Sequence, residues 1–155
     1  MKHLPFAAWP ACDRNALEAA FWPGDPFDGG AGSGSHLSPP TRVWIQSSYG
    51  RWLGFLEAHD GDAINLAPAD RITAQRVQAY VGHLSARVRL SSVATYVEGL
   101  LRIGRLIAPD QDWRWLRRVK SRISARIVPE DRFHRLVPPW ETLDLGIPYE
   151  RGGSP

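Results

Sequence analysis

The residues best placed to do chemistry in this chain are the cations between Asp112 and Arg126. They alternate with apolar residues, Leu116, Val119 and Ile123, at the i, i+3 and i+7 spacing of one helical face. The pattern predicts an amphipathic helix whose other side carries Arg114, Arg117, Arg118, Lys120, Arg122 and Arg126. No acidic residue lies between Trp113 and Ile127 to neutralise them. A helix face with this density of positive charge is expected to bind a polyanion, and a nucleic-acid backbone is the leading candidate. The alternative is a solvated surface helix.

Charge is segregated along the whole chain. Residues 1–70 carry four basic and eight acidic side chains, a net charge of −4, and residues 71–126 carry twelve basic and three acidic ones, a net charge of +9. This asymmetry is typical of proteins with a nucleic-acid-binding surface, although it does not indicate base recognition.

Length and composition are those of a globular protein. The chain has 155 residues, of which 43% are hydrophobic and 23% charged, enough for one domain with a core plus appendages. The single cysteine, Cys12, cannot form an internal disulfide or a cysteine metal cluster. No apolar run approaches the roughly 20 residues that span a bilayer, and the N-terminus lacks a signal-peptide pattern. We therefore expect a cytoplasmic protein without membrane association.

Residues 1–38 are expected to form an N-terminal arm. Its residues 13–22 predict a short helix with Asp13 as N-cap and Pro23 as its end, which is either a docking element or a loosely attached arm. The segment 23–35 is dense in Gly, Pro and Ser and predicts a flexible linker.

Residues 39–128 are expected to form the folded domain, because four amphipathic patterns follow one another with short loops and no strand pattern. The first helix follows Pro39-Pro40, with Ser38 or Thr41 near its cap, and ends before Asp60. The second has Thr73 as N-cap and runs to Val88, the third is capped by Ser91 or Ser92 and stops before Pro109, and the fourth has Asp112 as N-cap. The fold class is therefore all-α, a compact four-helix bundle of roughly 90 residues.

Residues 129–155 are expected to be a linker and a truncated tail. Pro129, Pro138 and Pro139 break any long helix, and residues 139–145 read as the opening turn of another helix that is then cut short. This pattern suggests a fragment or a truncated gene product.

Five short motifs follow one another along the predicted bundle. They are Tyr49-x-x-Trp-Leu-x-Phe-Leu56, Ile72-Thr73 with Tyr80, Ser91-Ser92-Val93, Ala108-Pro109 and Asp112-Trp113-x-Trp-Leu116. Their order and spacing resemble the core-binding domain of phage integrases and tyrosine recombinases, a four-helix, SAM-like module that clamps DNA. The resemblance covers about residues 38–126, and residues 136–143 look like the linker to the catalytic domain of such proteins.

The resemblance implies DNA binding in recombination or integration, in a bacterial or phage-type protein associated with the nucleoid. In the family the second and fourth helices face DNA, which carries over to Thr73, Gln75, Arg76, Gln78, Arg114, Arg117, Arg118, Lys120 and Arg122. Arg and Lys would neutralise phosphates, and Thr or Gln would hydrogen-bond backbone or base edges. With about six phosphates engaged, the logarithm of affinity should fall with log salt at a slope near −5. Other recombinase protomers on the DNA are further partners that the resemblance implies.

Catalysis is not expected of this chain. The family cleaves DNA with a tyrosine assisted by Arg, Lys and a His-x-x-Arg pair, but no histidine here has Arg at the third following position, and Tyr149 lies among Gly and Pro. The five histidines lack metal-ligand spacing, and Asp60 and Asp62 read as turn residues. We expect no cofactor, no metal and no small-molecule substrate.

Two other functions stay open. The basic face could bind an acidic protein partner, which would make the chain a helical protein-interaction module. The chain could also be an enzyme in its own right, which predicts DNA strand cleavage or relaxation by the purified protein.

Overall fold

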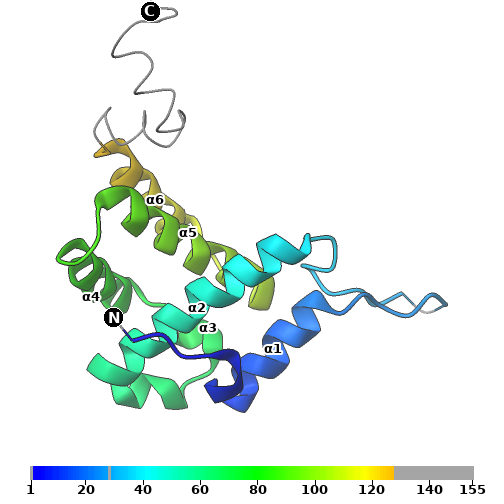
Figure 1. The fold of residues 1–155 in the computed structure, drawn as a ribbon. Coiled ribbons are helices and arrows are strands. Elements are labelled where there is room, and N and C mark those ends of the chain that lie inside the picture. The colour runs from blue at the N-terminus through cyan, green and yellow to red at the C-terminus, as the bar shows by residue number, and fades with distance from the viewer. Residues whose placement is uncertain (1, 28, 128–155) are drawn as a thin grey trace, which may run out of the picture.

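The structure is a computed structural model that describes residues 2–27 and 29–127. These residues form an all-α fold that contains helices and no β-strand (Figure 1). The elements in order are η1 (Phe6–Ala8), α1 (Ala11–Phe21), α2 (Pro39–His59), η2 (Gly61–Asn65), α3 (Pro68–Arg71), α4 (Ala74–Ser85), α5 (Leu90–Ile107) and α6 (Arg114–Ala125). The predicted linker and tail at 129–155 lie outside the described residues.

Two of the predicted helix starts are confirmed by their caps. The Ser38 hydroxyl accepts the amide hydrogen of Thr41 at the start of α2, and the Thr73 hydroxyl accepts that of Arg76, at 3.2 Å, at the start of α4. Each cap satisfies an amide that has no partner within its helix.

The predicted cap of the third helix is wrong. Helix α5 begins at Leu90, with Arg89 in the N-cap position and no side-chain hydrogen bond there. Ser91 and Ser92 therefore lie inside the first turn, and Ser91 is buried. Helix α4 is also shorter than predicted, because the chain turns after Ser85 and the amide of Val88 bonds back to the carbonyl of Leu84.

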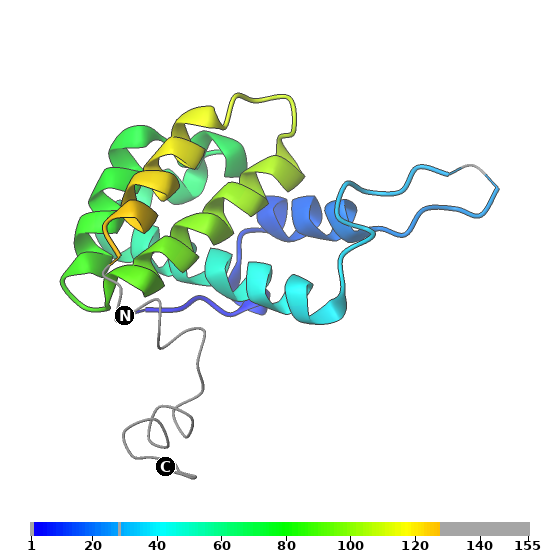
Figure 2. The same cartoon turned by 90° about the horizontal axis from the view of Figure 1, so that it is seen from above.

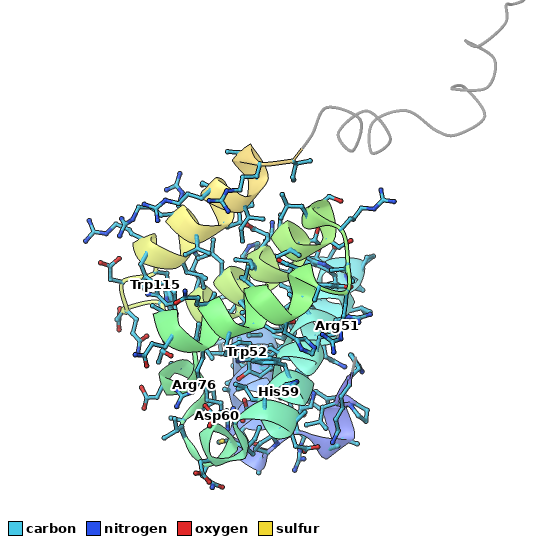
Figure 3. All side chains as sticks on the ribbon, turned by 90° about the vertical axis from the view of Figure 1, so that its left-hand side faces the viewer. Arg51, Trp52, His59, Asp60, Arg76 and Trp115 are labelled. Carbon is cyan, nitrogen blue, oxygen red and sulfur yellow. The ribbon has the colours of Figure 1, made fainter. Side chains whose placement is uncertain are left out.

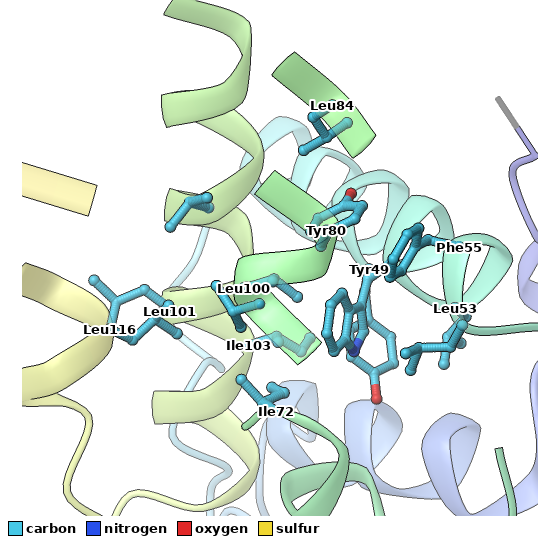
Figure 4. Packing of buried hydrophobic residues seen from close by; sticks show 14 of the residues in the cluster. Tyr49, Leu53, Phe55, Ile72, Tyr80, Leu84, Leu100, Leu101, Ile103 and Leu116 are labelled. Carbon is cyan, nitrogen blue, oxygen red and sulfur yellow. The ribbon is translucent and has the colours of Figure 1, made fainter. Parts of the chain in front are cut away.

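Helix α5 is the centre of the bundle and contacts α1, α2, α3, α4 and α6. Figure 4 shows its buried side chains, among them Leu100 and Ile103, meeting those of the neighbouring helices. Two glycines allow close approach: a Cβ on Gly99 would lie 2.5 Å from that of Ser48 on α2, and one on Gly104 would lie 2.9 Å from the Trp113 ring. The positions of α2 and α6 thus depend on glycines of α5.

The N-terminal segment is a docking element rather than a loosely attached arm. Leu4, Trp9 and Leu17 are buried in the same core cluster as the long helices, and the amide of Leu4 donates to the carbonyl of Gly50 at 3.0 Å. The segment therefore belongs to the bundle.

Asp13 does not cap α1, contrary to the prediction. The helix begins at Ala11, so Asp13 lies in its first turn, and its side chain forms a fully buried salt bridge with Arg71 of α3. The Tyr49 hydroxyl donates to the same carboxylate, and Arg71 also donates to the carbonyl of Ala63 at 2.9 Å and to that of Ile64 at 2.7 Å. Burial, with the Asp13 charge nearby, raises the pKa of Tyr49 well above its ordinary value.

The described residues of the segment 23–35, which exclude residue 28, contain backbone hydrogen bonds that define a turn. The amide of Asp25 donates to the carbonyl of Gly29 at 2.7 Å, and the amide of Gly29 returns a bond of 2.8 Å. Gly24, Gly29 and Gly30 have positive φ values, which a turn of this kind requires of glycine. The Ser33 hydroxyl donates to the carbonyl of Leu106 on α5 at 3.0 Å. Its glycines therefore shape the turn.

We predict that Asp13→Ala destabilises the protein by about 3–5 kcal/mol, because it leaves the Arg71 guanidinium buried without its carboxylate. Urea unfolding followed by circular dichroism measures the change. Glu57→Ala is the control, because it removes an exposed ion pair with Lys2 and should cost about 1 kcal/mol or less. Equal effects of the two substitutions would contradict this account.

Candidate nucleic-acid interface

Helix α4 presents two glutamines to solvent. Val77, Tyr80 and Leu84 are buried and fix the helix against the core, so the opposite positions, Gln75 and Gln78, are exposed. Thr73 is half-buried and its hydroxyl is used as the N-cap. Of the predicted polar residues of α4, the two glutamines are therefore the ones available to a ligand.

Arg76 is held by the protein itself. Its Nε donates to Asp60 Oδ2 at 2.9 Å, and its side chain is 26% exposed. Figure 3 shows it beside Asp60, close to His59 at the end of α2. Thr73, Gln75, Arg76, His59 and Asp60 line a cavity of about 360 Å³ there. The ion pair joins the start of α4 to the end of α2.

Helix α6 is attached through its apolar stripe. Leu116 and Ile123 are buried, and Trp113, just before the helix, donates from Nε1 to the carbonyl of Ala108 at 2.9 Å. In Figure 3, several long nitrogen-tipped side chains extend from α6 away from the bundle. The cationic side predicted from the sequence therefore faces outward.

Arg114 is neutralised by its neighbour Asp112. Its Nε and Nη2 donate to the two carboxylate oxygens at 3.0 and 2.9 Å, and the backbone amide of Arg114 donates to Asp112 Oδ1 at 2.9 Å. Asp112 thus accepts a first-turn amide, as an N-cap would, although Trp113 occupies the N-cap position. The hydrogen bonds from Arg114 lower the pKa of the Asp112 carboxyl to about 2.

Lys120 lies on the flank of α6 that faces α5. Its Nζ is 3.7 Å from Glu98 Oε1, and Arg102 Nε is 3.3 Å from the other oxygen of the same carboxylate. Lys120 and Ser124 line a cavity of about 280 Å³ with Trp44 of α2 and with Glu98. The expectation that all the cations of α6 share one surface with α4 therefore does not hold for Lys120.

The other flank of α6 forms a groove with α4. The α4–α6 groove has a volume of about 350 Å³ and is lined by Ala74, Val77, Gln78, Val81, Val119, Arg122, Ile123 and Arg126. Its floor is apolar, and its polar lining comes from Gln78 on one helix and from Arg122 and Arg126 on the other. This groove brings residues of the two predicted DNA-facing helices together.

Four arginines of α6 and its C-cap are exposed without an ion pair among the residues that the structure describes: Arg117, Arg118, Arg122 and Arg126. Arg118, Arg122 and Arg126 are spaced four residues apart and so share one helix face, two of them lining the groove. The sequence predicted Arg126 on the cationic side of the helix but not among the DNA-contacting residues. Its spacing of four residues from Arg122 would have indicated that it shares a face with that residue.

In residues 2–27 and 29–127 no three His, Cys, Asp or Glu side chains are close enough to hold a metal ion. None of the helices in this part of the chain combines the length and apolar character of a membrane span.

No protein-family model matches the chain, and no curated protein and no solved structure is significantly similar to it.

We predict that the Asp112 carboxyl titrates with a midpoint of about 2, below its ordinary value of 3.8. Because folding lowers this pKa, the contact with Arg114 contributes stability above about pH 4 that is lost as the pH falls through the folded value. Carboxyl ¹³C NMR measures the midpoint. Arg114→Ala should raise it toward 3.8, and Arg117→Ala, a neighbouring arginine without contact to Asp112, should leave it unchanged. A midpoint near 3.8 in the unsubstituted protein would contradict the assignment.

Proposed function

We propose that this chain is the DNA-binding module of a tyrosine recombinase or integrase-like protein, and that it has no catalytic activity by itself. The observation that carries the proposal is a groove at which Arg122 and Arg126 lie opposite the exposed Gln78 of α4. Arg118 lies on the same helix face, and none of the three arginines has an ion pair among the described residues. Phosphate contacts of arginine supply most of the affinity in such interfaces. A polar side chain next to them can position the duplex or contact base edges.

The helix order supports the same proposal. Helices α2, α4, α5 and α6, each of 12 residues or more, occur in the order that the resemblance to a four-helix, SAM-like core-binding domain implies. In this scheme α4 and α6 are the second and fourth helices, which are the DNA-facing pair. The charge pattern and the helix order are separate arguments for one surface.

The predicted DNA contacts differ in whether the side chain already contacts a carboxylate. Arg118, Arg122 and Arg126 have no ion pair with the described residues that binding a phosphate would break, and Gln75 and Gln78 would donate hydrogen bonds. Arg76, Arg114 and Lys120 each contact a carboxylate and would have to exchange it for a phosphate. They therefore contribute less to affinity. The four unpaired arginines alone give a slope of log affinity against log salt of about −4.

The apolar floor of the α4–α6 groove favours a second candidate, a helical module that binds an acidic protein partner. Phosphates do not need an apolar surface, whereas a peptide with apolar and acidic side chains would cover both the floor and the arginines. The two candidates differ in their preferred polyanion.

We predict that Arg118→Gln/Arg122→Gln weakens duplex binding on the order of fiftyfold at 0.1 M salt and makes the salt slope shallower by about 2, because two phosphate contacts are lost. Fluorescence anisotropy with a labelled duplex at several salt concentrations measures both quantities. Arg102→Gln/Arg105→Gln is the control for net charge, because it removes two positive charges from exposed positions of α5. Arg102, unlike Arg118 and Arg122, is paired with Glu98.

Equal losses in the two double variants would show that only net charge matters and would contradict the proposed surface. Binding of poly-glutamate without duplex binding at low salt would favour the acidic protein partner. Strand cleavage or relaxation of plasmid DNA by the purified chain would contradict the proposed lack of catalysis.

A further inference from the structure

Two histidines from different helices lie against each other. His59 is in the last turn of α2 and His83 is in the last turn of α4. Their ring centroids are 4.8 Å apart, and the ring planes are inclined to each other by 62°. His59 is exposed and His83 is half-buried, and Figure 3 shows His59 on the face of the molecule turned to the viewer. The pair is therefore open to solvent.

The core supports the two rings from one side. Phe55 is buried and packs against both of them, with its ring centroid 4.8 Å from that of His59 and 5.1 Å from that of His83. Among the described residues, neither imidazole takes part in a hydrogen bond or an ion pair. A ring nitrogen of neutral imidazole without another partner can bind a metal ion. The rings are thus held in place while their nitrogens stay available.

The separation of the two rings matches that of two imidazoles on one metal ion. A zinc–nitrogen bond is about 2.0–2.1 Å long and the nitrogen lies about 1.1 Å from its ring centroid, so each centroid lies about 3.2 Å from the ion. With an angle of about 90–110° at the ion, the two centroids are about 4.5–5.2 Å apart. The observed 4.8 Å lies within this range. Because His59 is exposed, rotation of its ring can turn a nitrogen toward an ion bound to His83.

We propose that His59 and His83 form a binding site for a divalent transition-metal ion such as Zn²⁺, which would join the end of α2 to α4. Imidazole is a preferred ligand of such ions. No third His, Cys, Asp or Glu side chain among the described residues completes the group, so water would fill the other positions and the site would stay open. The inference goes beyond the proposed function and does not depend on it, because its test contains no DNA.

The charged neighbours of the pair make this a site of modest affinity. Asp60 follows His59, but its carboxylate accepts a hydrogen bond from Arg76 Nε at 2.9 Å and is not free to bind an ion. Arg87 donates from Nη1 to the carbonyl of His83 at 3.3 Å, and its positive charge opposes that of the metal. Binding therefore depends on the two imidazoles together.

Titration of the full chain with Zn²⁺, followed by NMR of the histidine rings, tests the proposal. At about pH 7.5, where imidazole is mostly neutral, Zn²⁺ should shift the ring resonances of His59 and His83 and leave those of the other histidines in place. At about ten times its dissociation constant, Zn²⁺ should raise the thermal midpoint by about 3–6 °C, because only the folded chain holds the two rings together. Mg²⁺, which prefers oxygen ligands, is the control ion and should change neither quantity.

Single substitutions show whether both rings are needed. His59→Ala and His83→Gln should each weaken Zn²⁺ binding about tenfold or more, because each leaves one imidazole. His36→Ala is the matched control and should bind Zn²⁺ as the unsubstituted chain does. His36 is exposed and lies in the connection between α1 and α2, which Figures 1 and 2 show at the end of the bundle opposite α4. Absence of Zn²⁺ shifts at His59 and His83, full affinity in either single variant, or an equal loss in His36→Ala would each overturn the proposal.

Discussion

The attachment of α6 through one narrow apolar stripe is the constraint on which the candidate site depends. Leu116 and Ile123 are buried, and the Trp113 ring lies against Gly104 of α5, so the rotation of the helix about its axis is fixed. A helix held along one stripe has two flanks as well as an outer face. One flank meets α4 and carries Arg122, and the other meets α5 and carries Lys120. The cationic side of α6 is thereby divided between two neighbours.

The flank on which a cation of α6 lies decides whether it is available to bind a ligand. Glu98 of α5 takes up Lys120 and Arg102, and Asp112 takes up Arg114, whereas the described residues of α4 supply no acidic side chain to the groove. Exposed ion pairs are worth little to stability, about 0–1 kcal/mol, but they lower the local potential that a ligand experiences. Two arginines without an ion pair among the described residues, Arg122 and Arg126, thus lie where α6 meets α4.

Much of the fold follows from local patterns in the sequence. Spacing of apolar residues and caps such as Ser38 and Thr73 predicted α2, α4 and α6, and the same periodicity placed Gln78 and Arg122 on exposed faces. The role of Asp13 could not be predicted in this way, because an acid before a helical pattern resembles an N-cap and its true partner, Arg71, lies 58 residues away. The positive φ values of Gly24, Gly29 and Gly30 could not be predicted either. Composition alone does not distinguish a flexible glycine from one that closes a turn.

The buried pair of Asp13 and Arg71 also affects where this protein can be divided. The resemblance to core-binding domains starts near residue 38, but a polypeptide beginning at Pro39 would contain the guanidinium of Arg71 without the carboxylate that balances it in the dry interior. It would also lack Leu4, Trp9 and Leu17, which fill part of the same core. We therefore expect the smallest piece able to fold by itself to include Leu4, Trp9 and Asp13, which lie before the border suggested by sequence likeness.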